Sequence, residues 1–140
     1  VQQRENVSVG QATEELWETI RPGKNASLEI RQSPTIQADP TAIQRLLENL
    51  LLNAVEHGGE AVTLSVGALE DGFFLEDDGP GVPPDDREDI FSPGFSTKAE
   101  GSGIGMTSVR EIVAAHDWTV SVAEGESGGA RFEIHTDPRN

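Results

Sequence analysis

The chain is 140 residues long, a length that suits one domain with a buried core. Its 10 basic and 25 acidic residues give a formal net charge of −15. Such a surface disfavours nucleic acid and anionic membranes as partners, because both bind clusters of Lys and Arg. Cysteine is absent, which excludes disulfides and thiolate chemistry. No apolar run is long enough to cross a bilayer, so we expect no direct membrane contact.

The acidic residues are spread along the chain, for example between Glu14 and Glu126, and form no single acidic tail. Like charges at this density loosen a fold in dilute buffer, whereas molar salt screens them within about 3 Å. The charge therefore favours a halophilic source, with a merely acidic domain as the alternative. Because Val1 is not an initiator Met, we also expect the chain to be a piece of a longer protein.

The N-terminal third is expected to hold one short helix and two short strands. Thr13 is a candidate N-cap for a helix that runs to Ile20. Apolar residues that alternate with polar ones predict a strand at Leu28–Ile30 and another that opens at Ile36.

The clearest predicted helix begins at Asp39-Pro40 and runs to His57. Asp is a favoured N-cap and Pro a favoured first helical residue, while Gly58-Gly59 is typical of a helix end. The apolar positions repeat with the i, i+3, i+4 spacing of a buried stripe, at Ile43, Leu46, Leu47, Leu50, Leu51 and Ala54.

Two strands are predicted next, Val62–Ala68 and Phe73–Asp77, joined by a turn at Glu70–Gly72. Phe73, Leu75 and Asp77 share the face of the second strand that lies opposite Phe74 and Glu76.

The C-terminal half is expected to continue with a short helix, a loop rich in Gly, Ser and Thr, a second long helix and two closing strands. These segments are Asp85–Ile90, Ser92–Gly105, Gly105–His116, Val120–Val122 and Ala130–Ile134. Strands that interleave with a few helices predict an α/β sandwich, in which about three helices cover one face of a mixed, mainly antiparallel sheet.

Three polar residues form one ridge of the first long helix, because Asn49, Asn53 and His57 are each four residues apart. A neutral amide oxygen suits Mg²⁺, which takes oxygen ligands and often binds phosphates as well. The alternative is a polar helix edge that faces solvent.

A second cluster is Asp77-Asp78-Gly79-Pro80-Gly81. The Asp77 carboxylate is expected at the rim of an apolar pocket, where the exocyclic amine of a purine would supply the donor that a buried carboxylate needs. Gly79 and Gly81 would let the backbone pass close to a flat ring. An ordinary Asp-Gly, Pro-Gly turn is the alternative.

Two further clusters point to phosphate. Phe91–Lys98 carries the ammonium group of Lys98, and Gly101–Gly105 leads straight into the second long helix, whose N-terminus can bind an anion. The alternative for Phe91–Lys98 is two core aromatics and one exposed Lys. The strand that precedes a Rossmann glycine loop and the P-loop pattern are both missing, so neither of those folds is expected.

Taken in order, these clusters resemble the conserved boxes of sensor histidine kinases. The N, G1, F, G2 and last glycine boxes correspond to Glu48–Ala54, Asp77–Gly81, Phe91–Lys98, Gly101–Gly105 and Gly128–Phe132. The resemblance implies the Bergerat ATP-binding fold, shared with gyrase, Hsp90 and MutL, with a mobile ATP lid. It places the ATP-binding catalytic domain at residues 9–140 and a remnant of a linker from an acceptor-helix domain at residues 1–8.

The same resemblance implies a role for each matching residue, with ATP and Mg²⁺ as cofactors. Asn53 would coordinate Mg²⁺, Asn49 would line the phosphate site and Asp77 would accept the adenine amino group. Asn49, Asn53 and Lys98 are the implied catalytic residues. The nucleotide-binding set is Asn49, Asn53, His57, Asp77, Gly79, Gly81, Lys98, Gly101, Gly103, Ile104 and Gly105.

The sequence departs from the family pattern at three positions. Glu56 stands where many relatives carry a Lys that approaches the phosphates, Gly94 replaces a common Phe, and Asp78 replaces a common Asn. A carboxylate at position 56 would repel phosphate, which puts one contact in doubt.

The implied function is transfer of the γ-phosphoryl group of ATP to a histidine on a separate dimerisation domain absent from this chain. None of the three histidines is expected to be the phosphoacceptor, because His57 and His116 lie in predicted helices of the catalytic domain and His135 lies in its last predicted strand. Relatives that hydrolyse ATP keep a Glu four residues before the Mg²⁺ ligand. Here that position is Asn49, and Glu48 points about 100° away, which favours a kinase.

Two alternatives are another kinase or ATPase of the superfamily and a degenerate module that binds nucleotide or a partner without catalysis. The implied partners are the protein's own dimerisation domain and the receiver domain of a response regulator. We expect a cytoplasmic domain that is monomeric alone and belongs to a homodimeric whole protein, whether or not that protein is anchored in a membrane.

Overall fold

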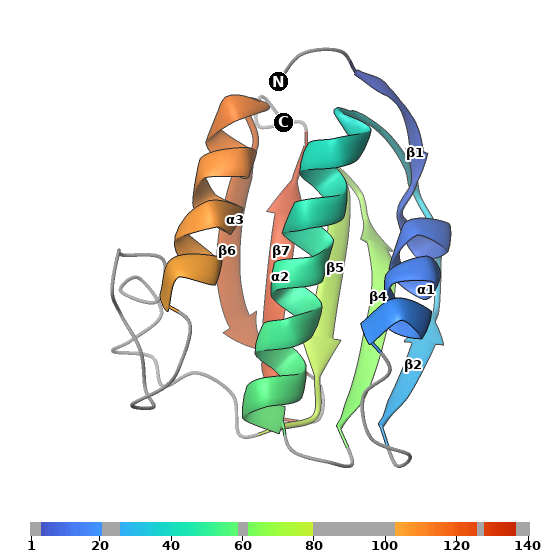
Figure 1. Cartoon of the computed structure of the whole chain (residues 1–140), viewed down its shortest axis with the longest axis vertical. Coiled ribbons are helices and arrows are strands. Elements are labelled where there is room, and N and C mark those ends of the chain that lie inside the picture. Colours follow the sequence, from blue (N-terminus) through green and yellow to red (C-terminus); the bar gives the residue numbers. More distant parts are fainter. Residues whose placement is uncertain (1–3, 21–25, 59–61, 80–102, 126–127, 137–140) are drawn as a thin grey trace.

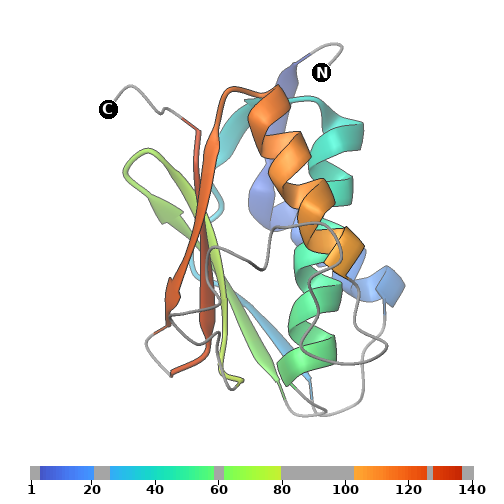
Figure 2. The same cartoon turned by 90° about the vertical axis from the view of Figure 1, so that its left-hand side faces the viewer.

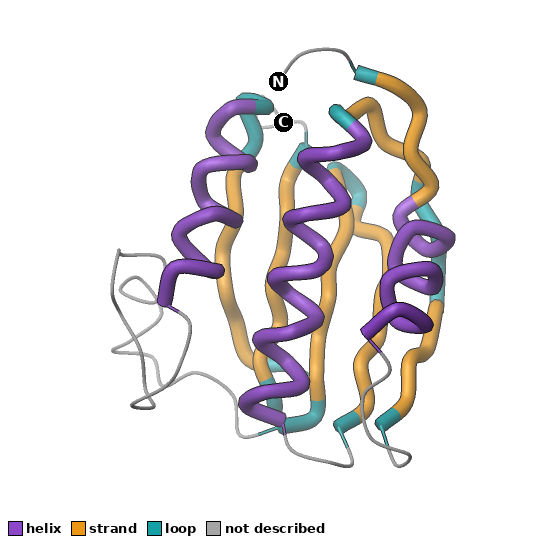
Figure 3. The backbone as a smooth tube through the Cα atoms, in the orientation of Figure 1, coloured by secondary structure: helices purple, strands orange, loops and turns teal. Residues whose placement is uncertain are grey.

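The computed structural model describes residues 4–20, 26–58, 62–79, 103–125 and 128–136. In this part of the chain, three helices lie on one face of a five-stranded sheet (Figures 1, 2 and 3). The face without helices is called the open face below. The predicted α/β sandwich is confirmed.

The helices are α1 (Val9–Ile20), α2 (Pro40–Gly58) and α3 (Gly103–Ala115). The strands are β1 (Glu5–Ser8), β2 (Ser27–Ile30), β3 (Thr35–Ala38), β4 (Thr63–Leu69), β5 (Gly72–Asp77), β6 (Thr119–Glu124) and β7 (Ala130–His135). The short helix predicted at 85–90 lies outside the described residues.

The main sheet has the strand order β2-β4-β5-β7-β6. The β2–β4 pair is parallel and the other three pairs are antiparallel, which confirms the predicted mixed, mainly antiparallel sheet. Strands β1 and β3 form a separate antiparallel pair. Strand β1 is not among the predicted elements, because the family resemblance implies a linker remnant at residues 1–8.

Helix α1 begins four residues before the predicted cap. Thr13 lies inside the helix, fully buried, and its hydroxyl donates to the carbonyl of Val9 at 2.7 Å. A hydroxyl inside a helix commonly bonds the carbonyl four residues back, so Thr13 does not cap. The Ser8 hydroxyl instead accepts from the N–H of Gln11 at 3.4 Å, at the true helix start.

Helix α2 is the central helix of the layer and lies between α1 and α3 (Figure 1). The Asp39 carboxylate accepts from the N–H groups of Thr41 and Ala42, at 3.1 and 3.4 Å, which confirms the predicted N-cap. All six residues of the predicted stripe are buried: Ile43, Leu46, Leu47, Leu50, Leu51 and Ala54.

Helix α3 packs against α2, and the predicted inward residues lie in the helix or, in the case of His116, directly after its last residue, Ala115. Val109, Val113 and His116 are buried, whereas Ile112 is only partly buried. The helix starts at Gly103, two residues earlier than expected. No helix in the described part of the chain is long and apolar enough to span a membrane.

Candidate functional site

Asp77 is the last residue of β5 and lies on the helix-covered face with Phe73 and Leu75. It is 7% exposed. Its Oδ1 accepts from the N–H of Gly79 at 2.9 Å and from the N–H of Ala130 at 3.2 Å. A buried carboxylate is costly without donors, and these two contacts hold it at the end of the strand.

The backbone of Gly129 lies close to Asp77. A Cβ at Gly129 would lie 2.0 Å from the Asp77 carbonyl oxygen and 2.5 Å from its Oδ1, so no side chain fits there. The glycine box at 128–132 matches the family pattern, but no contact was predicted for it. The structure adds Gly129 and Ala130 to the site, and the Gly128-Gly129 pair is the signal that marks them.

The turn between β6 and β7 closes beside these residues. The N–H of Gly125 donates to the Gly129 carbonyl at 2.7 Å, and the N–H of Gly128 donates to the Gly125 carbonyl at 3.0 Å. Gly128 has a φ of 88°, a left-handed conformation that glycine adopts without strain.

Asn49 and Asn53 are half-buried and lie one turn apart in the C-terminal half of α2. Arg45, one turn earlier on the same ridge, donates to the Ser108 hydroxyl of α3 at 3.3 Å. This ridge of α2 therefore faces α3. The C-terminal end of α2, the end of β5 and the start of α3 all lie toward one end of the molecule (Figures 1 and 2).

Gly103, Ile104 and Gly105 lie in the first turn of α3. The first four N–H groups of an α-helix have no partner inside the helix and carry the positive end of its dipole. The backbone at these three residues can therefore bind an anion such as phosphate.

Asp78, which replaces a common Asn, accepts from the N–H of Thr63 at 2.8 Å and so anchors the start of β4. The predicted site residues Gly81, Lys98 and Gly101 lie outside the described part, as does the whole of the predicted box at Phe91–Lys98. The side chains of Glu56 and His57 lie outside it as well.

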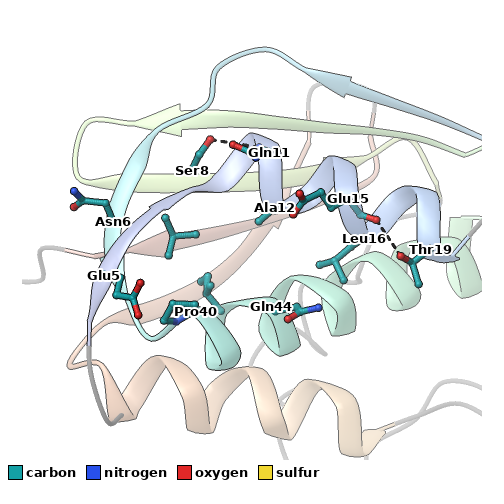
Figure 4. A pocket seen from close by; sticks show the side chains of 12 residues that line it. Glu5, Asn6, Ser8, Gln11, Ala12, Glu15, Leu16, Thr19, Pro40 and Gln44 are labelled. Carbon is teal, nitrogen blue, oxygen red and sulfur yellow. Dashed lines mark hydrogen bonds between the residues drawn. The ribbon is translucent and has the colours of Figure 1, made fainter.

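A pocket of about 380 Å³ lies between β1, α1 and the N-terminal end of α2 (Figure 4). Its charged lining residues are Glu5 and Glu15, which would repel phosphate. Asp77, Asn49 and Asn53 are not among its lining residues. This pocket is therefore distinct from the predicted site.

The chain matches the family described as histidine kinase-, DNA gyrase B-, and HSP90-like ATPase over residues 38–140. Sensor histidine kinase ZraS of Escherichia coli O157:H7 is 44% identical over 105 residues, 72% of this chain and 23% of ZraS. Adaptive-response sensory kinase SasA of Trichormus variabilis is 36% identical over 110 residues, 72% of this chain and 27% of SasA. The chain thus spans about a quarter of the length of these relatives.

Solved structures show the same fold. The nucleotide-free catalytic domain of histidine kinase ThkA superposes with a TM-score of 0.74 at 26% identity, covering 94% of this chain and 93% of that one. The mycobacterial sensor histidine kinase MprB superposes with a TM-score of 0.80 at 22% identity, covering 94% and 95%. The expected Bergerat fold is confirmed.

Proposed function

Since this chain belongs to the family of histidine kinase-, DNA gyrase B- and HSP90-like ATPases, as the ATP-binding catalytic domain of a sensor histidine kinase, we propose a function for the whole protein. It transfers the γ-phosphoryl group of ATP to a histidine on a separate dimerisation domain. The observation that carries the proposal is the buried carboxylate of Asp77, held by Gly79 and Ala130 at the edge of the helix-covered face.

In this proposal Asp77 accepts a hydrogen bond from the exocyclic amine of adenine. An ionised carboxylate can accept several hydrogen bonds at once. The N–H groups of Gly79 and Ala130 already orient it in the absence of nucleotide. Gly79 and Gly81 leave room for the flat ring, as glycine permits a close backbone approach.

Asn53 would hold Mg²⁺ through its amide oxygen, and Asn49 would line the phosphate site. Both are half-buried on the ridge of α2 that faces α3, and neutral oxygen donors suit this ion when phosphates complete its shell. When bound, Mg²⁺ supplies neutralisation of phosphate charge, which is central to phosphoryl transfer.

The phosphates would meet the N-terminus of α3 at Gly103, Ile104 and Gly105, together with Gly101 and Lys98 of the lid. Backbone N–H groups at a helix N-terminus bind phosphate without a side chain. His57, one turn beyond Asn53, would pack near the nucleotide.

Transfer to histidine is favoured over hydrolysis by the residue at position 49. An amide cannot act as the general base that activates water, and Glu48 points about 100° away from the ridge. The second candidate is a module that binds nucleotide or a partner without catalysis. The carboxylate of Glu56, where many relatives carry a Lys, favours that candidate.

We further propose the partners and location that follow from this function. The domain acts on the dimerisation domain of its own homodimeric protein, which passes the phosphoryl group to the receiver domain of a response regulator. The domain itself is monomeric and cytoplasmic, whether or not the whole protein is anchored in a membrane.

Calorimetric titration of the chain with ATP, with and without Mg²⁺, tests the site. Asn53→Ala is expected to remove the Mg²⁺-dependent part of the affinity, and Asp77→Asn to weaken binding about tenfold, the equivalent of one hydrogen bond. Gln44→Ala, an exposed change near the other end of α2, is the matched control. Unchanged affinity in both site variants would overturn the assignment.

Transfer itself is tested by adding a purified dimerisation domain that carries the acceptor histidine, together with radiolabelled ATP. Label on that histidine supports the kinase. ATP binding without transfer supports the module that lacks catalysis.

We also propose that the charge of −15 is an adaptation to high salt. Molar KCl screens repulsion among surface carboxylates. We expect the affinity for ATP to be higher in molar KCl than at low KCl. The midpoint of thermal unfolding should also be higher in molar KCl. A midpoint that falls in KCl would identify a merely acidic domain.

A further inference from the structure

Glu76 precedes Asp77 in β5 and therefore points to the opposite face of the sheet. That is the open face, which none of the described helices covers (Figure 2). Glu76 is nevertheless only 3% exposed. The proposed nucleotide site gives this buried carboxylate no role.

Two arginine side chains contact the Glu76 carboxylate on the open face. Arg131 lies directly across from it in the β5–β7 ladder, and its Nη1 donates to Glu76 Oε1 at 3.0 Å. Arg31 approaches Oε2 to 4.0 Å. The Arg131 guanidinium also lies 3.9 Å from the centre of the Phe74 ring, and its Nε donates to Glu133 at 2.8 Å. A buried ion pair is costly to break, because the remaining charge is left uncompensated.

The last two residues of β5, Glu76 and Asp77, lie close to the two glycines that flank the β6–β7 turn, one on each face of the sheet. A Cβ at Gly125 would lie 3.3 Å from Glu76 Oε2, and a Cβ at Gly129 would lie 2.5 Å from Asp77 Oδ1. These two glycines are joined to each other by the 2.7 Å hydrogen bond of the turn. Two consecutive residues of β7 contact the same two residues of β5. The Arg131 guanidinium donates to the Glu76 carboxylate, and the backbone N–H of Ala130 donates to the Asp77 carboxylate.

We infer that Glu76 and Arg131 are positioning residues for base recognition, which lock the start of β7 so that Ala130 holds the Asp77 carboxylate in place. The inference rests on the proposed role of Asp77 toward adenine. It assigns part of the base specificity to a face of the sheet that the nucleotide does not touch. Without the ion pair the N–H of Ala130 is no longer held against Asp77, and the carboxylate is then oriented by the hydrogen bond from Gly79 alone.

The test compares ATP with purine riboside triphosphate, which lacks the exocyclic amine. We expect the folded 140-residue chain to prefer ATP about tenfold, the value of one hydrogen bond. Glu76→Gln and Arg131→Gln should reduce this preference at least about threefold, by weakening binding of ATP alone. Loss of stability without repositioning would weaken both nucleotides equally and leave the ratio unchanged.

Amide hydrogen exchange supplies a second readout that does not depend on nucleotide. In both variants the N–H of Ala130 should exchange about tenfold faster, while that of Ile134 on the same strand is unchanged. Glu133→Gln is the matched control, because Glu133 also bonds Arg131 but lies opposite Phe74, three residues along β7 from Ala130. It should alter neither the ratio nor the exchange of Ala130.

An unchanged ratio together with unchanged Ala130 exchange, in folded variants, overturns the inference. If the unaltered chain itself shows no preference for ATP, the adenine role of Asp77 fails, and Ala130 exchange alone then decides on the positioning. If the Gln variants do not fold, Arg131→Lys replaces them, since Lys keeps the charge but not the planar fork that reaches Glu76 and Glu133 together. It should still lower the ratio, and an unchanged ratio would overturn the inference.

Discussion

The backbone N–H of Asp39 donates to Nε2 of His116 at 3.1 Å, so the residue that caps α2 is held by the residue that follows α3. Because Nε2 accepts this bond, the ring proton is on Nδ1, which lies 2.8 Å from the Ile112 carbonyl. The ring also stacks on Trp118 with centroids 4.3 Å apart. One buried imidazole therefore joins two helices at the end of the molecule away from Asp77.

His116→Phe is expected to lower the free energy of unfolding by about 1–3 kcal/mol, because it leaves the Asp39 N–H and the Ile112 carbonyl without this partner. Urea unfolding measures the loss. His135→Phe is the control, since it removes a half-exposed contact with Asp71 that is worth less than about 1 kcal/mol. Equal losses in the two variants would contradict the linking role of His116.

Asp39→Ala should destabilise the chain by about 0.5–2 kcal/mol, because Thr41 and Ala42 lose the acceptor for their N–H groups. Asp39→Asn keeps an oxygen acceptor at the cap and should stay within a few tenths of a kcal/mol of the unaltered chain. Thermal unfolding of both variants checks the prediction. An Asn variant as unstable as the Ala variant would show that the charge of Asp39, rather than capping, is what matters.

Gly129→Ala should destabilise the chain by about 1–3 kcal/mol and weaken ATP binding, because the new methyl group meets the Asp77 backbone and cannot be accommodated by rotating a side chain. Gly128→Asn is the neighbouring control. A Cβ at Gly128 meets nothing within 4 Å, and Asn tolerates a positive φ better than most residues. Calorimetry with ATP and thermal unfolding should both separate the two variants, and similar behaviour would contradict the close Gly129–Asp77 packing.

Gly67→Ala should lower the free energy of unfolding of the chain by about 1–3 kcal/mol, since the new Cβ would lie 2.4 Å from the Phe74 ring on the open face. Phe74→Leu removes the ring and leaves room for that methyl group. In a double-mutant cycle the combined loss should therefore be smaller than the sum of the single losses. An additive result would show that the methyl group is accommodated without moving Phe74.

Features that depend on neighbours in the chain could be predicted well from the sequence. Asp39, Pro40 and the six-residue apolar stripe define α2 because capping and helix periodicity act over a few residues. The alternation in β5 correctly placed Asp77 with Phe73 and Leu75. The order of the boxes identified the family, and their contacts with ATP and Mg²⁺ stay predictions.

Features that depend on distant partners could not be predicted in this way. Thr13 was a plausible cap by residue type, but β1 pairs with β3 and brings the helix start forward to Val9. Alternation placed Glu76 away from the core and said nothing of its burial. Its partner Arg131 is 55 residues along the chain, so only the tertiary structure brings them together. Side-chain periodicity is a local property, whereas the pairing of buried charges depends on which strands become neighbours.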